Sequence, residues 1–94
     1  MTELSFTIVE YTISNAAKSI LIKRENSPRE VYVPIFSKTQ CTKDRAIIDM
    51  KDYLPREFPE CDEFEIFIFE SDGNIGLCSL PEQVREELVF EEII

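Results

Sequence analysis

Apolar and β-branched residues dominate three short segments in the first third of the chain. These segments are residues 4–13, 18–24 and 31–36. In the first of them, Leu4, Phe6 and Ile8 alternate with polar residues, which is typical of a strand with one buried face. The gaps, residues 14–17 and 25–28, contain the Ser, Asn and Pro that favour turns. The pattern predicts an antiparallel meander in which Pro34 places the third strand at an edge or in a bulge.

The spacing of apolar residues changes at residues 42–54. Apolar side chains there recur every three or four positions, which indicates one face of a helix: Ala46, Ile47, Met50, Tyr53 and Leu54. Thr42 or Thr39 is the expected N-cap. Pro55 is expected to end the helix, because the residue before a proline is pushed out of the α region, and residues 56–62 then form a loop. The alternative is a strand at residues 45–49, where two isoleucines are adjacent.

Residues 64–70 are the most apolar segment, with Glu65 the one polar position before Glu70. A strand with apolar side chains on both faces is expected to be central and covered on each side. Asp72-Gly73 then predicts a tight hairpin to a returning strand at residues 75–80. A two-residue loop places two phenyl rings opposite small residues, Phe69 opposite Gly76 and Phe67 opposite Cys78.

The last segment has the pattern of an acidic helix. Ser79-Leu80-Pro81-Glu82 has the form of a capping box with proline in the first turn. Val84, Leu88 and Val89 would form its apolar stripe. The predicted order is therefore βββαββα. Residues 1–94 are expected to form one α+β domain, with an antiparallel sheet of about five strands covered by one or two helices.

The whole chain has a net charge of −9, and the negative charge is concentrated in its second part. Residues 1–54 carry eight Lys/Arg and seven Asp/Glu, a net charge of +1, whereas residues 55–94 carry two and twelve, a net charge of −10. A field of one sign repels nucleic acids and membrane surfaces and attracts basic partners. We therefore expect a basic partner protein, with no direct contact to nucleic acid and no membrane.

A second interpretation of the charges is binding of a single-stranded nucleic acid along a basic strip with two tyrosines. The strip would contain Lys18, Lys23, Arg24, Arg29 and Lys38, beside Tyr11 and Tyr32. Aromatic and basic residues in such an arrangement can bind single strands. A sequence pI of about 4.4 lacks the basic footprint of this class, so ordinary surface lysines are the favoured interpretation.

The residues that usually carry catalysis are sparse. The chain has no histidine, the commonest acid–base group and metal ligand near neutral pH. It also has no CxxC pair, phosphate-binding glycine loop or nucleophile elbow. Two carboxylate clusters are candidate metal ligands: Glu60, Asp62, Glu63 and Glu65, and Glu70, Asp72 and Asn74. The second lacks the rest of a calcium loop. We expect no cofactor, no metal and no enzymatic activity.

Cysteine use and hydropathy bear on location. Cys41, Cys61 and Cys78 are widely spaced and odd in number, which argues against a disulfide framework and favours a reducing cytoplasm, the host's for a viral protein. The longest apolar runs are much shorter than a membrane-spanning helix, and we expect no secretory signal.

These features predict a partner-binding surface in which acidic residues surround three apolar anchors, Phe58, Phe90 and Ile94. Its residues are Glu57, Phe58, Glu60, Asp62, Glu63, Glu82, Glu86, Glu87, Phe90, Glu91, Glu92 and Ile94. We expect a non-catalytic protein-binding module, namely a small acidic inhibitor or regulator that occupies a basic surface of its partner. Phage-type and immunity-type inhibitors and DNA mimics act in this way. Mimicry of DNA requires that the acids form one continuous face, since phosphate contacts follow a regular charge spacing.

Two other functions are alternatives. A structural or regulatory subunit would act through homo- or hetero-oligomerisation, using the edge strand near Pro34 or the apolar residues Ile93 and Ile94. An enzyme would have to use carboxylates or cysteine in an unfamiliar arrangement.

Overall fold

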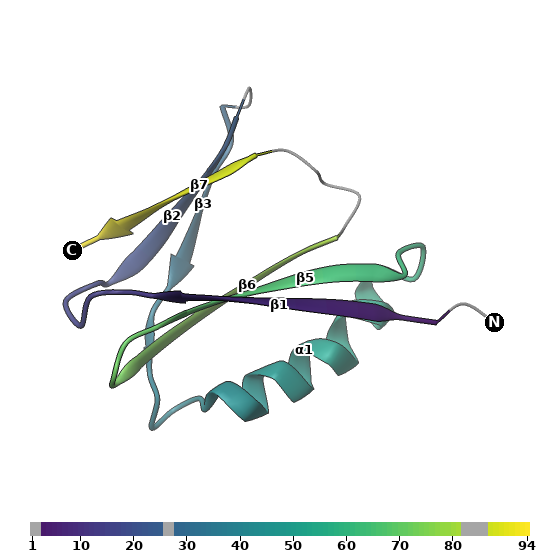
Figure 1. Ribbon diagram of the computed structural model, residues 1–94, viewed down its shortest axis with the longest axis horizontal. Helices are drawn as coiled ribbons and strands as arrows, with labels where there is room; N and C mark the ends of the chain where they lie inside the picture. Colours follow the sequence, from purple (N-terminus) through teal and green to yellow (C-terminus); the bar gives the residue numbers. More distant parts are fainter. Residues whose placement is uncertain (1–2, 26–27, 82–86) are drawn as a thin grey trace.

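The computed structural model describes residues 3–25, 28–81 and 87–94 (Figure 1). Its elements are β1 (Ser5–Thr12), β2 (Ser19–Arg24), β3 (Glu30–Pro34), β4 (Phe36–Ser37), α1 (Lys43–Glu57), β5 (Glu63–Glu70), β6 (Asn74–Pro81) and β7 (Leu88–Ile93). The strands of the described residues form two sheets. The first sheet has the order β1-β5-β6-β4 and the second sheet has the order β3-β2-β7. The α+β class is as predicted.

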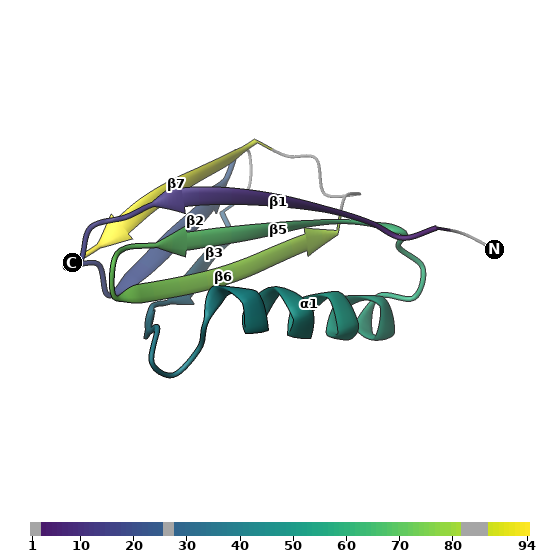
Figure 2. The same cartoon turned by 60° about the horizontal axis from the view of Figure 1, so that its bottom comes forward.

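The elements form three layers, with the first sheet between α1 and the second sheet (Figure 2). The alternation of β5 explains this arrangement. Ile66 and Ile68 belong to the cluster that packs against Leu54 of α1, whereas Phe67 and Phe69 belong to the cluster that includes residues of the second sheet. All four β5 side chains are buried. The prediction that this strand is central and covered on both faces is confirmed.

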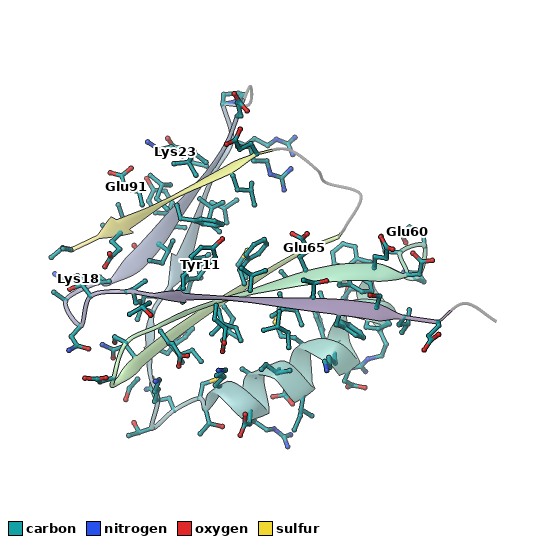
Figure 3. All side chains as sticks on the ribbon, viewed as in Figure 1. Tyr11, Lys18, Lys23, Glu60, Glu65 and Glu91 are labelled. Carbon is teal, nitrogen blue, oxygen red and sulfur yellow. The ribbon has the colours of Figure 1, made fainter. Side chains whose placement is uncertain are left out.

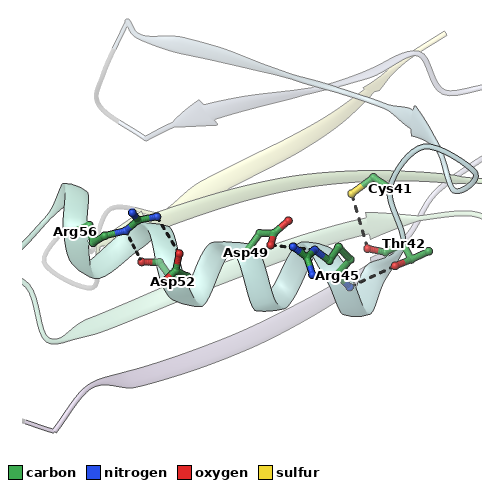
Figure 4. Close-up of polar contacts among 6 residues, drawn as sticks. All are labelled: Cys41, Thr42, Arg45, Asp49, Asp52 and Arg56. Atoms are coloured by element: carbon green, nitrogen blue, oxygen red, sulfur yellow. Dashed lines mark hydrogen bonds and ion pairs between the residues drawn. The ribbon is translucent and has the colours of Figure 1, made fainter.

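Helix α1 is stabilised at its start and along its exposed face (Figure 4). The Thr42 side chain is the N-cap and accepts a hydrogen bond from the backbone N–H of Arg45 at 3.3 Å, which satisfies one of the helix's first free donors. Arg45 then pairs with Asp49 at 3.2 Å, and Arg56 with Asp52 at 2.8 Å, each four residues apart.

Among the described residues, no helix is long and apolar enough to cross a membrane.

The predicted end of this helix was wrong. Pro55 lies inside α1, which continues to Glu57, and the alternative of a strand at residues 45–49 is also wrong. A proline inside a helix removes one hydrogen bond and costs about 3 kcal/mol. Packing of the fully buried Leu54 and the half-buried Phe58 against the first sheet favours continuation of the helix, and the Phe58 N–H still reaches the Leu54 carbonyl at 2.9 Å.

The predicted meander was only partly right. The antiparallel pair β2–β3 is present, with Leu21 opposite Tyr32. However, β1 does not pair with β2, because it runs parallel to β5 in the other sheet. Ring contacts accompany this long-range pairing: Phe6 stacks on Phe64 with centroids 5.5 Å apart, and Tyr11 stacks on Phe69 at 5.4 Å. A five-stranded antiparallel sheet is therefore replaced by two smaller sheets.

The predicted third strand, residues 31–36, is divided between the two sheets. β3 ends at Pro34 in the second sheet, and β4 begins at Phe36 in the first. Because proline cannot donate to a ladder, it suits the end of an edge strand. The predicted edge position of this strand is confirmed.

The hairpin after β5 has the predicted register. Phe69 lies opposite Gly76 and Phe67 lies opposite Cys78. The Ser71 N–H donates to the Asn74 carbonyl at 3.0 Å. The two-residue loop is therefore sufficient to set the register between β5 and β6.

The predicted C-terminal helix was wrong. β6 extends to Pro81, and Leu88–Ile93 is a strand that pairs antiparallel with β2. Phe90 explains why this segment forms a strand, because the centroid of its ring lies 4.9 Å from that of Tyr11 and 5.2 Å from that of Phe69. Alternation at Leu88 and Phe90 turns both side chains toward the core between the sheets. Val84, which the helix prediction used, lies outside the described residues.

Gly76 tests how closely the two sheets approach. A Cβ atom there would lie 2.5 Å from Ile35 Cδ1 and 3.1 Å from the Pro34 carbonyl oxygen. We expect Gly76→Val to lower the free energy of unfolding by about 1–3 kcal/mol because of overpacking. Urea denaturation measures the change.

Gly73 in the hairpin loop is the matched control, since a Cβ there meets nothing within 4 Å. Gly73→Ala should change the free energy of unfolding by no more than about 0.5 kcal/mol. Equal effects at both glycines would contradict the close approach of Pro34 to β6.

Candidate functional site

The predicted acidic residues lie in two separate regions. Figure 3 shows Glu60 near one end of the long axis and Glu91, on β7, toward the other. The first region contains Glu57 at the end of α1, Glu60 and Asp62 in the loop that follows, and Glu63 at the start of β5. The second contains Glu87, Glu91 and Glu92. Glu82 and Glu86 lie outside the described residues. The described residues of the predicted acidic surface therefore fall into two groups, one near the start of β5 and one in and just before β7.

The predicted apolar anchors have different surroundings. Phe58 is half-buried and packs against the cluster between α1 and β5. Phe90 is also half-buried and contacts the rings of Tyr11, Phe67 and Phe69. The outward position that a helix gave to Phe90 is thus corrected, because β7 turns its ring inward. Ile94 is 74% exposed.

The two glutamates of β7 are held by specific contacts. Glu91 pairs with Lys23 of the adjacent strand β2, with Oε2 3.4 Å from Nζ. Glu92 Oε1 accepts a hydrogen bond from the backbone N–H of Ser14 at 2.8 Å. Ser14 follows β1, so Glu92 joins the end of the first sheet to the second sheet.

A cavity of about 170 Å³ lies beside these glutamates, between the two sheets. We call it the inter-sheet slot. It is lined by Tyr11, Thr12, Ile13, Ile20, Phe69, Phe90, Glu91 and Glu92. Three of these residues, Phe90, Glu91 and Glu92, were predicted from the sequence. The slot itself was not, because its walls come from β1, β2, β5 and β7, which are distant in sequence.

The chemistry of the slot suits a cationic side chain with an apolar stem. Tyr11, Phe69 and Phe90 provide aromatic rings, whose faces attract cations. Ile13 and Ile20 provide apolar surface, and Glu92 adds a carboxylate. The Glu91 side chain alternates to the other face of β7, where it pairs with Lys23. Lysine and arginine combine an apolar stem with a charged end, so the slot has the properties of a pocket for either.

A second, more polar cavity of about 450 Å³ lies at the hairpin end of the first sheet. Its lining is Thr12, Ile13, Asn15, Lys38, Glu70, Ser71 and Asp72. Glu70 is paired there with Lys38 at 3.0 Å and with Lys43 at 3.7 Å. The Asn74 side chain donates to the Asn15 carbonyl at 3.3 Å. Two of the three residues of the calcium-like cluster, Glu70 and Asn74, are thus engaged in the protein's own contacts. Among the described residues, no group of three potential metal ligands is found.

The three cysteines are free thiols. Burial raises the pKa of the Cys61 thiol, and the nearby carboxylates of Glu60 and Asp62 raise it further. Burial also raises the pKa of Cys78, with Arg24 opposing the shift. Because the thiolate is the nucleophile, these two groups are poorly suited to covalent catalysis.

Comparisons with protein-family models, with curated proteins and with solved structures find no match. The candidate site therefore rests on its own geometry.

The Glu70 pairs predict a pH dependence. The hydrogen bond from Lys38 holds the pKa of the Glu70 carboxyl below its ordinary value of 4.5; burial opposes this, and the charges of Lys38 and Lys43 add to the lowering. A lowered folded pKa contributes stability above the unfolded pKa, and this contribution is lost as pH falls through the folded pKa. Glu70→Gln should therefore lose less stability than the original chain as pH falls below 4.5.

Titration of the Glu70 side-chain carboxyl by carbon NMR checks the cause directly. Lys38→Met should raise the pKa of Glu70 toward its ordinary value. A titration unchanged in Lys38→Met would show that the Lys38 pair is not the cause of the shift.

Proposed function

We propose that this chain is a non-catalytic protein-binding module that holds a basic segment of a partner protein at the inter-sheet slot. The observation that carries the proposal is the presence of Glu92 beside the rings of Tyr11 and Phe90. A carboxylate next to aromatic surface is a favourable environment for one lysine or arginine side chain. The absence of histidine and the raised pKa of two thiols support a non-catalytic role.

The energetics of such an anchor are modest for one side chain. A cation over an aromatic face contributes about 0.5–1 kcal/mol when exposed and about 2 kcal/mol when desolvated. Hydrogen bonds between ions add to this and give direction. Affinity for a whole partner then requires further contacts around the slot, and the net charge of −9 of the whole chain attracts a basic surface.

The class of protein we propose is a small acidic inhibitor or regulator, of the phage or immunity type, that occupies a basic surface of its partner. A nucleic-acid-binding surface is one such target, since its lysines and arginines ordinarily meet phosphates. The separation of Glu60 from Glu91 (Figure 3) favours a local anchor over imitation of a continuous nucleic-acid backbone. Specificity then comes from the slot and not from the total charge.

Binding of an oligo-arginine peptide, followed by NMR of the full chain, tests this function. We expect shifts of Tyr11, Phe90 and Glu92 signals, and no shifts with an oligo-glutamate peptide. Glu92→Gln should raise the dissociation constant roughly tenfold, because it removes the charge at the slot.

The matched control is Glu60→Gln, which removes the same charge at the other acidic region. It should raise the dissociation constant by about twofold or less. Equal losses in the two variants, or binding that is unchanged from low to high salt, would contradict recognition at the slot.

A structural or regulatory subunit is the second candidate function. It is favoured by the edge strand β3, on which the Tyr32 side chain is 59% exposed. Assembly through β3 predicts that Tyr32→Lys dissociates oligomers in a light-scattering measurement. Of the two terminal isoleucines considered for this role, Ile93 pairs with Ser19 in the second sheet, which leaves Ile94 as the more exposed one.

A further inference from the structure

β1 forms an edge of the first sheet. In the described part of the chain it pairs with β5 on one side and with no strand on the other. Most of its eight side chains are exposed. Natural edge strands are usually protected by lysine, proline, a bulge or short length. β1 contains neither lysine nor proline, and its one charged residue, Glu10, already pairs with Lys43 of α1.

The backbone of β1 has a defined outward set of hydrogen-bonding groups. The N–H groups of Ser5 and Ile13 donate to β5-side carbonyls, those of Asp62 at 2.8 Å and Glu70 at 2.9 Å. In a parallel pair, residues that bond to the partner strand alternate with residues that point away from it. The odd-numbered residues therefore face β5, and the N–H and C=O groups of Phe6, Ile8 and Glu10 point outward along the edge.

The side chains of these outward-bonding residues lie on the α1 side of the sheet. Lys51 Nζ lies 5.7 Å from the centroid of the Phe6 ring, and Lys43 pairs with Glu10. Ile8 lies between them and is 38% exposed. Ile48 is 60% exposed, and it shares the side of the helix that carries Lys51, three residues later. The edge therefore combines open hydrogen-bonding groups with an apolar patch and a lysine.

We infer that β1 pairs antiparallel with β1 of a second copy of this chain, about a twofold axis at Ile8. The outward groups then exchange hydrogen bonds when Ile8 faces the partner's Ile8 and Phe6 faces the partner's Glu10. This register is the one that places two isoleucines together at the centre. The first sheets of the two copies then form one continuous sheet. In Figure 2 the partner's β1 would lie beside β1, on the side away from β5.

Charge complementarity argues for a second copy as the occupant. In this register the partner's Glu10 comes to lie on the same face as Phe6, over which Lys51 is placed. The twofold axis makes this contact twice. The net charge of −9 on each copy opposes association, so the dimer should become more stable as salt screens that repulsion. This inference does not depend on the inter-sheet slot.

Sedimentation equilibrium of the full chain, at an ionic strength of about 0.15 M and from micromolar to millimolar concentration, tests the dimer. Hydrogen exchange followed by NMR tests the strand: the amides of Phe6, Ile8 and Glu10 should gain protection as concentration rises. Ile8→Lys places like charges opposite each other and should raise the dissociation constant at least tenfold, or about 1.4 kcal/mol.

Two further variants make the test specific. Lys51→Glu changes an exposed helix position, so the fold is retained, and it should weaken the dimer by about two- to fivefold. Tyr32→Lys, on the edge strand β3 of the second sheet, should change the dissociation constant by about twofold or less. A chain that stays monomeric throughout would overturn the inference. So would a dimer that is lost in Tyr32→Lys but kept in Ile8→Lys, or protection of the β1 amides by an added peptide in a chain that remains monomeric.

Discussion

Burial of β5 on both faces is the constraint on which the rest of the structure depends. Its alternating side chains require two different covers, and α1 and the second sheet provide them. Each fully buried apolar side chain of this size contributes about 1.5–3 kcal/mol. The backbone of β5 also needs partners on both sides, and β1 and β6 satisfy it. Loss of any one of these neighbours would leave apolar surface or hydrogen-bonding groups exposed.

The position of the candidate site follows from the same constraint. The second sheet covers β5 at Phe67 and Phe69, whereas Glu65, on the same face, remains only half-buried. β7 contributes Phe90 to the aromatic cluster and carries Glu92 to the margin of that cluster. An acidic strand thus borders an aromatic surface because Phe90 and the glutamates are neighbours in sequence. The function that we propose depends on this combination more than on total charge.

Local signals in the sequence were sufficient for the local parts of the fold. The two-residue loop at Asp72-Gly73 specified the register of β5 and β6. Apolar residues spaced three or four positions apart identified α1 from Thr42 onward. The parallel pairing of β1 with β5 was not predictable, because nothing within either segment distinguishes a partner 58 residues away from a neighbouring one. The prediction of a C-terminal helix was wrong for a related reason. The positions of Leu88 and Phe90 fit a strand as well as a helix, and the long-range contact of Phe90 with Tyr11 and Phe69 favours the strand. The slot was missed because it exists only after both of these pairings.

The central claim is that β7 closes the second sheet against the first and so creates the inter-sheet slot. Proton–proton NOEs in solution test it most directly. The account predicts NOEs from the Phe90 ring to the rings of Tyr11 and Phe69, together with cross-strand NOEs between Phe90 and Ile22. A Phe90 ring without these contacts, with helical NOEs between residues three apart in Leu88–Ile93, would contradict the account and remove the basis of the proposed site.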